Sequence, residues 1–174
     1  MGKILTDEYE AFLKEGLLAY QKAESILKKR TWFEKGPWRT AISYYENPRT
    51  KGVGFQLFKP GWFNDEGKGI HLETAVAEYS FRHSSTDFFL HIETSKERAG
   101  FSAKDFHEAL KSEADNIFDQ FEDYKQYPNW PLQPLMGRFP FEMATLDHLV
   151  VKQLSRLRSF AACIDKLIKH FSEQ

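Results

Sequence analysis

The most restrictive feature of this sequence is a regular stripe of apolar residues close to its C-terminus. Between Glu142 and Phe171, apolar side chains recur at alternating steps of four and three residues: Leu146, Val150, Leu154, Leu157, Ala161, Ile164, Ile168 and Phe171. Steps of this size place side chains on one face of an α-helix. We therefore expect a long C-terminal helix with one buried face. That face packs either across a sheet of its own chain, which we favour, or against a second copy in a homodimer.

Two further segments have helical spacing. From Asp7 to Arg30 apolar residues recur every three or four positions: Tyr9, Phe12, Leu13, Leu17, Tyr20, Ala23 and Leu27. A second segment runs from Ser102 to about Glu122, and its first residues resemble a capping box. These patterns predict one helix at the N-terminus and another between the strands described next and the C-terminal helix.

Four segments rich in β-branched and aromatic residues lie near 39–46, 53–59, 69–81 and 87–94. This composition favours β-strands. The connections between them are shorter than the dozen or more residues of a parallel crossover, so the strands should be antiparallel neighbours. The segment from Tyr127 to Pro140 contains four prolines. We expect it to be an extended segment pinned by its aromatic rings rather than a free linker.

These patterns together predict an α+β fold. It consists of a four-stranded antiparallel meander, a helix at the N-terminus, and two helices after the sheet that pack on its apolar face. A chain of 174 residues fits one domain spanning residues 1–174, because folding at this length buries about 70% of the unfolded surface. The opposite face of the sheet should be at least partly exposed.

Composition and charge exclude several broad classes of protein. A formal net charge of -1 argues against a general nucleic-acid binder. No apolar run approaches the roughly 20 residues of a membrane span, so we expect no membrane partner. The single cysteine, Cys163, has no partner for an internal disulfide, which is typical of the cytoplasm. Nucleic-acid binding stays a weaker alternative because four basic residues lie near predicted loops: Arg39, Lys51, Lys59 and Lys68.

One near repeat in the chain carries side chains that can do chemistry. The pentapeptides Ile70-His71-Leu72-Glu73-Thr74 and Leu90-His91-Ile92-Glu93-Thr94 occupy two strands that we expect to be neighbours. Side chains alternate between the two faces along a strand. One face therefore receives the polar residues His71, Glu73, His91 and Glu93, while the apolar residues turn toward the core.

The register of the two strands decides whether these polar side chains meet. A connection centred on Arg82 sets His71 opposite Glu93 and Glu73 opposite His91. A centre two residues later sets Ala75 opposite Glu93 instead, and the polar cluster dissolves. The sequence leaves both registers open.

A cluster of two imidazoles and two carboxylates can ligate a divalent transition metal ion or act as a proton donor and acceptor. Such a site predicts a metal-dependent or acid-base enzyme, for example a hydrolase. The alternative is an ordinary polar sheet face, which we favour. Cross-strand pairs of this kind stabilise a hairpin by about 0.2 to 1 kcal/mol each, and such faces are often polar.

Several aromatic residues fall in predicted loops or at the ends of elements: Trp38, Trp62, Phe63 and Trp130. They either cap the ends of the core, which we favour, or line a groove for a peptide or another ligand. Because no catalytic motif is convincing, our first functional hypothesis is a non-catalytic binding module. It would recognise an unknown protein or small ligand through the exposed sheet face and the Trp62 loop.

Overall fold

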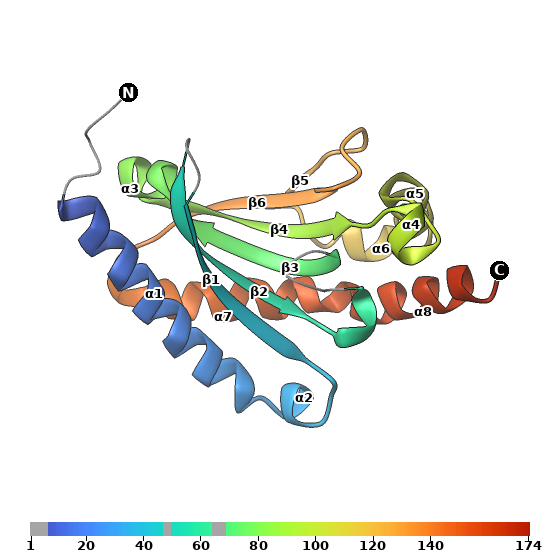
Figure 1. Ribbon diagram of the computed structural model, residues 1–174, viewed down its shortest axis with the longest axis horizontal. Coiled ribbons are helices and arrows are strands. Elements are labelled where there is room, and N and C mark those ends of the chain that lie inside the picture. The colour runs from blue at the N-terminus through green and yellow to red at the C-terminus, as the bar shows by residue number, and fades with distance from the viewer. Residues whose placement is uncertain (1–6, 47–49, 64–68) are drawn as a thin grey trace.

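Six antiparallel strands form one open sheet in the computed structural model of this chain, which describes residues 7–46, 50–63 and 69–174 (Figure 1). Their order across the sheet is β1-β2-β3-β4-β6-β5. Along the chain the strands are β1 Arg39–Glu46, β2 Lys51–Phe58, β3 Gly69–Val76, β4 Ser85–Glu93, β5 Lys125–Gln126 and β6 Leu135–Pro140. The α+β class and the antiparallel sheet are confirmed. The sheet is larger than the four strands that we expected.

Of the two additional strands, β6 comes from the proline-rich segment, which we did not assign to the sheet, and β5 lies just before that segment. β6 pairs with β4, so that Gly137 lies opposite Phe88. β5 is a two-residue strand that pairs with β6 at the edge of the sheet. Prolines are tolerated here because Pro134 precedes β6 and Pro140 ends it, so neither occupies the middle of the strand.

The third predicted strand is shorter than expected because a helix replaces its last part. β3 ends at Val76, and α3, Glu78–His83, follows it. The backbone N–H of Ala77 donates a hydrogen bond to the Ser80 hydroxyl at 3.2 Å, which stabilises the turn into the helix. Ser84 then takes a left-handed conformation, with φ 51°, and β4 begins at the next residue. The β3–β4 connection is therefore a helix rather than a plain turn.

Two long helices pack on one face of the sheet. α1, Asp7–Lys28, contacts β1, β2 and α7, while α7, Leu146–Leu157, contacts β3 and β4. α8, Ala161–Ser172, continues the direction of α7 beyond the sheet (Figure 1). The predicted C-terminal helix is thus divided by the 3₁₀ turn η3, Arg158–Phe160.

The apolar stripe of the C-terminal helices lies in the core of its own chain. Five of its residues have no exposed surface: Leu146, Val150, Leu154, Leu157 and Ile164. This confirms the arrangement that we favoured. A homodimer through these helices stays a prediction. It would have to use exposed residues of the helices, because the buried residues of the stripe already pack within the chain.

The helix predicted from Ser102 to about Glu122 is two helices, α5 Ala103–Glu113 and α6 Asp115–Phe118. The predicted cap is present, because the Ser102 hydroxyl accepts a hydrogen bond from the Asp105 backbone N–H at 3.1 Å. The shorter elements are α2 Thr31–Glu34, η1 Pro60–Trp62, α4 Lys96–Ala99 and η2 Met143–Thr145. Among the residues that the structure describes, no helix has both the length and the apolar character needed to cross a membrane.

The two faces of the sheet differ in chemistry. The middle of the face under the helices is mainly apolar and buried, with Phe55, Leu57, Ile70, Leu72, Phe88, Leu90 and Ile92. The opposite face, called here the open face, carries Gln56, His71, Glu73, His91 and Glu93. It is only partly exposed as a whole, because His71 and Gln56 are buried whereas Ser43 and Arg138 are accessible. This alternation places the polar cluster on the open face.

Candidate metal centre

The polar residues of the near repeat meet through a register that differs from both predicted ones. β3 and β4 are neighbours, and His71 lies directly opposite His91. Glu73 lies opposite Phe89, and Glu93 lies opposite Gly69. The connection is therefore centred on Phe81 rather than Arg82, a shift that keeps all four polar side chains on the same face. The assignment of the four residues to one face is confirmed, and the predicted cross-strand pairs are corrected.

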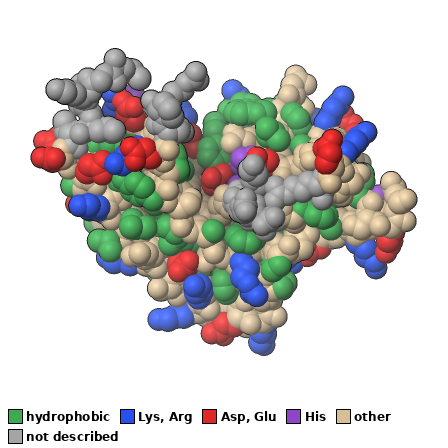
Figure 2. Space-filling model, viewed as in Figure 1, with side chains coloured by type: hydrophobic (Ala, Val, Ile, Leu, Met, Phe, Trp, Pro, Cys, Tyr) green, Lys and Arg blue, Asp and Glu red, His purple; other side chains and the backbone are tan. Residues whose placement is uncertain are grey.

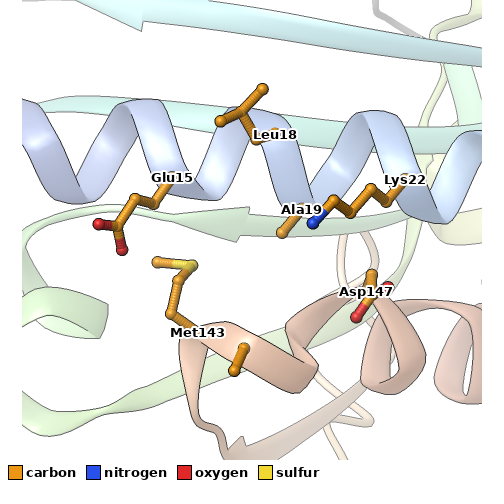
Figure 3. Close-up of a pocket in the computed structure, with 7 residues that line it drawn as sticks. Glu15, Leu18, Ala19, Lys22, Met143 and Asp147 are labelled. Carbon is orange, nitrogen blue, oxygen red and sulfur yellow. The ribbon is translucent and has the colours of Figure 1, made fainter.

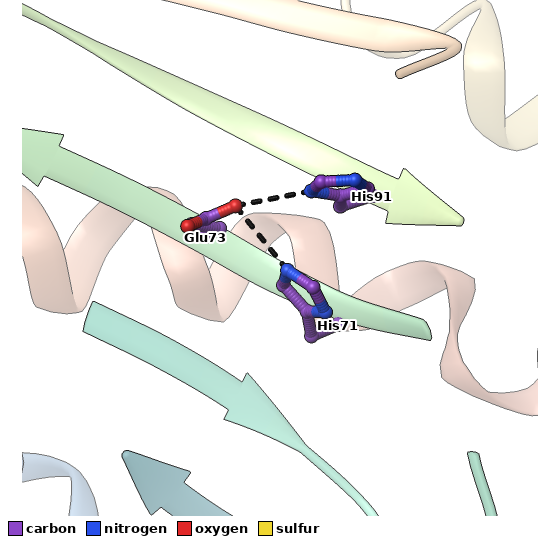
Figure 4. A group of neighbouring side chains, drawn as sticks. All are labelled: His71, Glu73 and His91. Carbon is purple, nitrogen blue, oxygen red and sulfur yellow. Dashed lines mark hydrogen bonds and ion pairs between the residues drawn. The ribbon is translucent and has the colours of Figure 1, made fainter. Parts of the chain in front are cut away.

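Two of the four side chains, His71 and His91, converge on one carboxylate oxygen of a third, Glu73 (Figure 4). Glu73 Oε2 lies 3.2 Å from His71 Nε2 and 3.1 Å from His91 Nδ1. The two imidazole rings lie side by side, with their centroids 4.6 Å apart. Glu93 stands at the edge of this group, with its Oε2 3.9 Å from His91 Nε2. The centre is thus a His-Glu-His group with a second carboxylate beside it.

The environment keeps Glu73 ionised. Burial alone would raise the pKa of this carboxyl group, but hydrogen bonds and charge interactions with His71 and His91 outweigh it and lower the pKa to about 2. An ionised carboxylate can only accept hydrogen bonds. The two ring nitrogens that face Glu73 therefore carry protons in this arrangement.

The spacing of the ligand atoms fits a transition metal ion. His71, Glu73 and His91 each offer one ligand atom, and these atoms lie within 4.8 Å of one another. Two ligands bound at about 2.0 to 2.2 Å to one ion are about 2.8 to 3.6 Å apart in octahedral or tetrahedral geometry. The two separations between Glu73 and the histidines already fall in this range. An ion that replaces the two shared protons needs only a small approach of the rings.

Burial differs strongly among the three side chains. His71 is 1% exposed, whereas the side chains of His91 and Glu73 are 17% and 23% exposed. The second ring nitrogen of His71, Nδ1, is buried and has no hydrogen-bond partner among the described residues. In the space-filling view, histidine and acidic side chains lie together near the middle of the visible face (Figure 2). The centre therefore opens to solvent on the side of His91 and Glu73.

Two of the predicted binding-surface tryptophans belong to the core instead. Trp38 is 5% exposed and Trp62 is 1% exposed. Their rings meet edge to face at 5.5 Å, and Trp62 Nε1 donates a hydrogen bond to Asp165 Oδ1 at 2.7 Å. The prediction that these two rings line an open surface is therefore wrong, and the alternative that they cap the core is correct.

The other two predicted surface rings are more accessible. Phe63 is partly buried and packs edge to face on Phe101, with centroids 5.5 Å apart. Trp130 is 45% exposed and contacts Tyr127. Among the described residues, neither ring stacks on His71 or His91. The predicted aromatic surface is thus reduced to separate rings rather than one continuous patch.

The basic residues considered for nucleic-acid binding have local partners. Lys51 forms an ion pair with Glu10, and Lys59 forms one with Asp165. Arg39 donates a hydrogen bond to the backbone carbonyl of Trp38. Lys68 lies outside the described residues. Charges neutralised in this way offer little support for the phosphate contacts that nucleic-acid binding requires.

A surface pocket of about 320 Å³ lies away from the centre, between α1 and the start of α7 (Figure 3). Its lining residues are Glu15, Leu18, Ala19, Lys22, Met143, Ala144 and Asp147. We did not predict it from the sequence. The sequence feature that could have indicated this pocket is Leu18, an apolar residue outside the buried stripe of α1. Its side chain is 57% exposed.

No protein-family model, curated protein or solved structure matches this chain. The function is therefore inferred from the geometry and chemistry of the centre.

Proposed function

We propose that this protein binds a divalent transition metal ion through His71, Glu73 and His91, and that it is a metal-dependent enzyme of the hydrolase class. The observation that carries the proposal is the position of Glu73 Oε2, within 3.2 Å of a nitrogen of each histidine. Two imidazoles and one carboxylate are a known donor set of catalytic zinc sites. The reducing cytoplasm predicted for this chain is compatible with such a centre.

The number of ligands favours catalysis over a purely structural role. Structural zinc sites almost always have four protein ligands, whereas catalytic sites have three and keep a position for water or substrate. When bound, the ion would acidify a water molecule or polarise a carbonyl or phosphoryl oxygen. The partial exposure of His91 and Glu73 leaves the open position accessible from the open face.

A metal titration tests the proposal directly. Wild-type protein, stripped with a chelator and then titrated with Zn²⁺ in a calorimeter, is expected to bind one ion per chain. His91→Ala should abolish this binding because it removes one ligand of three. His148→Ala is the matched control, since the His148 side chain on α7 is 75% exposed and distant in sequence from the centre.

Absence of stoichiometric Zn²⁺ binding to the wild type would exclude the metal-dependent function. The hypothesis of an acid-base enzyme would not be affected by that result. Glu73 also orients the partly exposed His91, as a carboxylate orients a general base. A catalytic role for His91 without a metal ion is therefore the second candidate within the enzyme class.

The non-catalytic binding module stays a separate proposal, supported by exposed apolar side chains between β5 and β6. Trp130 is 45% exposed and Leu132 is 40% exposed. Trp130→Ala is expected to leave the free energy of unfolding within about 0.5 kcal/mol of the wild type, as at most exposed sites. It should reduce recovery of a protein partner from cell lysate. Equal recovery by the wild type and the variant would contradict this proposal.

A further inference from the structure

Glu93 is the second carboxylate of the open face, and its surroundings direct it toward His91. His91 and Glu93 are two residues apart on β4, so both side chains project to the same face. The residue directly opposite Glu93 is Gly69, which has no side chain to compete for this position. Glu93 Oε2 lies 3.9 Å from His91 Nε2, the ring nitrogen that points away from Glu73. His91 therefore stands between two carboxylates.

The two histidines of the centre differ in this respect. His71 Nδ1 is buried without a hydrogen-bond partner among the described residues, whereas the corresponding outer nitrogen of His91 faces an anion. A histidine that binds a metal ion through one nitrogen usually donates the N–H of the other nitrogen to a carboxylate, a carbonyl or water. Only His91 has a carboxylate in this place.

We infer that Glu93 is a positioning residue, which holds His91 in the tautomer that binds the metal ion through Nδ1. The inference rests on the proposed function. In the metal-free protein the proton of His91 lies on Nδ1, where Glu73 accepts it. For Nδ1 to bind the ion, its proton would pass to solvent and Nε2 would take one proton from solvent, so the ring stays neutral. Glu93 would then close the present 3.9 Å separation and accept a hydrogen bond from the Nε2–H. Glu93 does not bind the ion itself.

Substitution of Glu93 isolates this role. Glu93→Gln keeps the size of the side chain and removes its charge, and we expect Zn²⁺ affinity to fall by about 10- to 100-fold, as for other partners of metal-binding histidines. Metal-free Glu93→Gln should unfold at the same urea concentration as the wild type, because the side chain is 41% exposed and the 3.9 Å contact is longer than a hydrogen bond. Glu46→Gln, at an exposed position on β1, is the control with unchanged affinity.

Two spectroscopic readouts test the mechanism of this effect in the full chain. Histidine ¹⁵N spectra of the Zn²⁺-loaded wild type should show the metal on His91 Nδ1 and the proton on Nε2. The Co²⁺ absorption intensity should be the same in the wild type and Glu93→Gln, because the number of ligands does not change. Weaker binding with both signatures supports the inference.

Three results would overturn it while the metal centre itself remains. These are equal Zn²⁺ affinity of the wild type and Glu93→Gln, a metal bound to His91 Nε2, or a changed Co²⁺ coordination number that makes Glu93 a direct ligand. Failure of the wild type to bind Zn²⁺ is a different result, because it removes the proposed function together with the role of Glu93.

Discussion

Replacing Trp62 by alanine is expected to lower the free energy of unfolding by about 3 to 5 kcal/mol, the usual cost of truncating a buried tryptophan or phenylalanine. The ring is 1% exposed and packs edge to face against Trp38. Its indole N–H also donates to Asp165 on α8. The substitution therefore leaves a cavity between η1 and α8 and removes a hydrogen bond that joins them.

Urea unfolding at equilibrium measures this loss. Trp130→Ala is the matched control, because the Trp130 ring is 45% exposed and its removal should change the free energy of unfolding by less than about 0.5 kcal/mol. A loss below about 1 kcal/mol for Trp62→Ala would show that the ring is dispensable to the core.

Trp62 also shows why loop residues were harder to place than periodic ones. The sequence around it contains Pro60 and Gly61, which correctly indicate a turn. Its burial depends on Trp38 and Asp165, which are distant from it in the chain. Trp38 is brought to it by the pairing of β1 with β2, and Asp165 by the packing of α8. Composition near a residue predicts local conformation, but it does not reveal which distant element will cover that residue.

The predictions of strands and helices were most accurate where the spacing of apolar residues stays regular over several helical turns or along a whole strand. The C-terminal stripe identified the buried face of α7, although one 3₁₀ turn interrupts the helix. β6 was missed because prolines flank it and its pairing partner β4 is far away in the sequence. A strand that pairs along its whole length with a distant strand, and only briefly with a nearby one, has little local signal.

The candidate centre was predictable only in part, because one of its features is local in the sequence and the other is not. Alternation along β3 and β4 correctly assigned the polar residues to one face, because this depends only on neighbouring residues. Their pairing depends on register, and the register follows from α3, a helix in a stretch whose composition predicts the end of a strand and a turn. Convergence on Glu73 was therefore a hypothesis until the connection between the strands was known.

Glu73→Gln is expected to remove specific metal binding, lowering Zn²⁺ affinity by at least about 100-fold. Glu73 supplies the only carboxylate oxygen within 3.2 Å of both histidines in the described structure. Loss of a direct ligand should exceed the 10- to 100-fold effect that follows from changing an outer partner. Calorimetric titration of the chelator-treated variant measures this change. Near-wild-type affinity would contradict the assignment of Glu73 as a ligand.

The same substitution should also change the acid dependence of stability. The pKa of Glu73 is lowered from 4.5 to about 2 in the folded chain, so its contribution is present above about pH 4.5 and is lost as pH falls toward 2. The full shift corresponds to about 3 kcal/mol. Glu73→Gln cannot titrate, and its unfolding free energy should fall less between about pH 5 and pH 3 than that of the wild type. Parallel pH profiles for the two proteins would show that the histidines do not hold Glu73 ionised. The measurement needs no metal ion, and it therefore tests the hydrogen-bonded group independently of its proposed function.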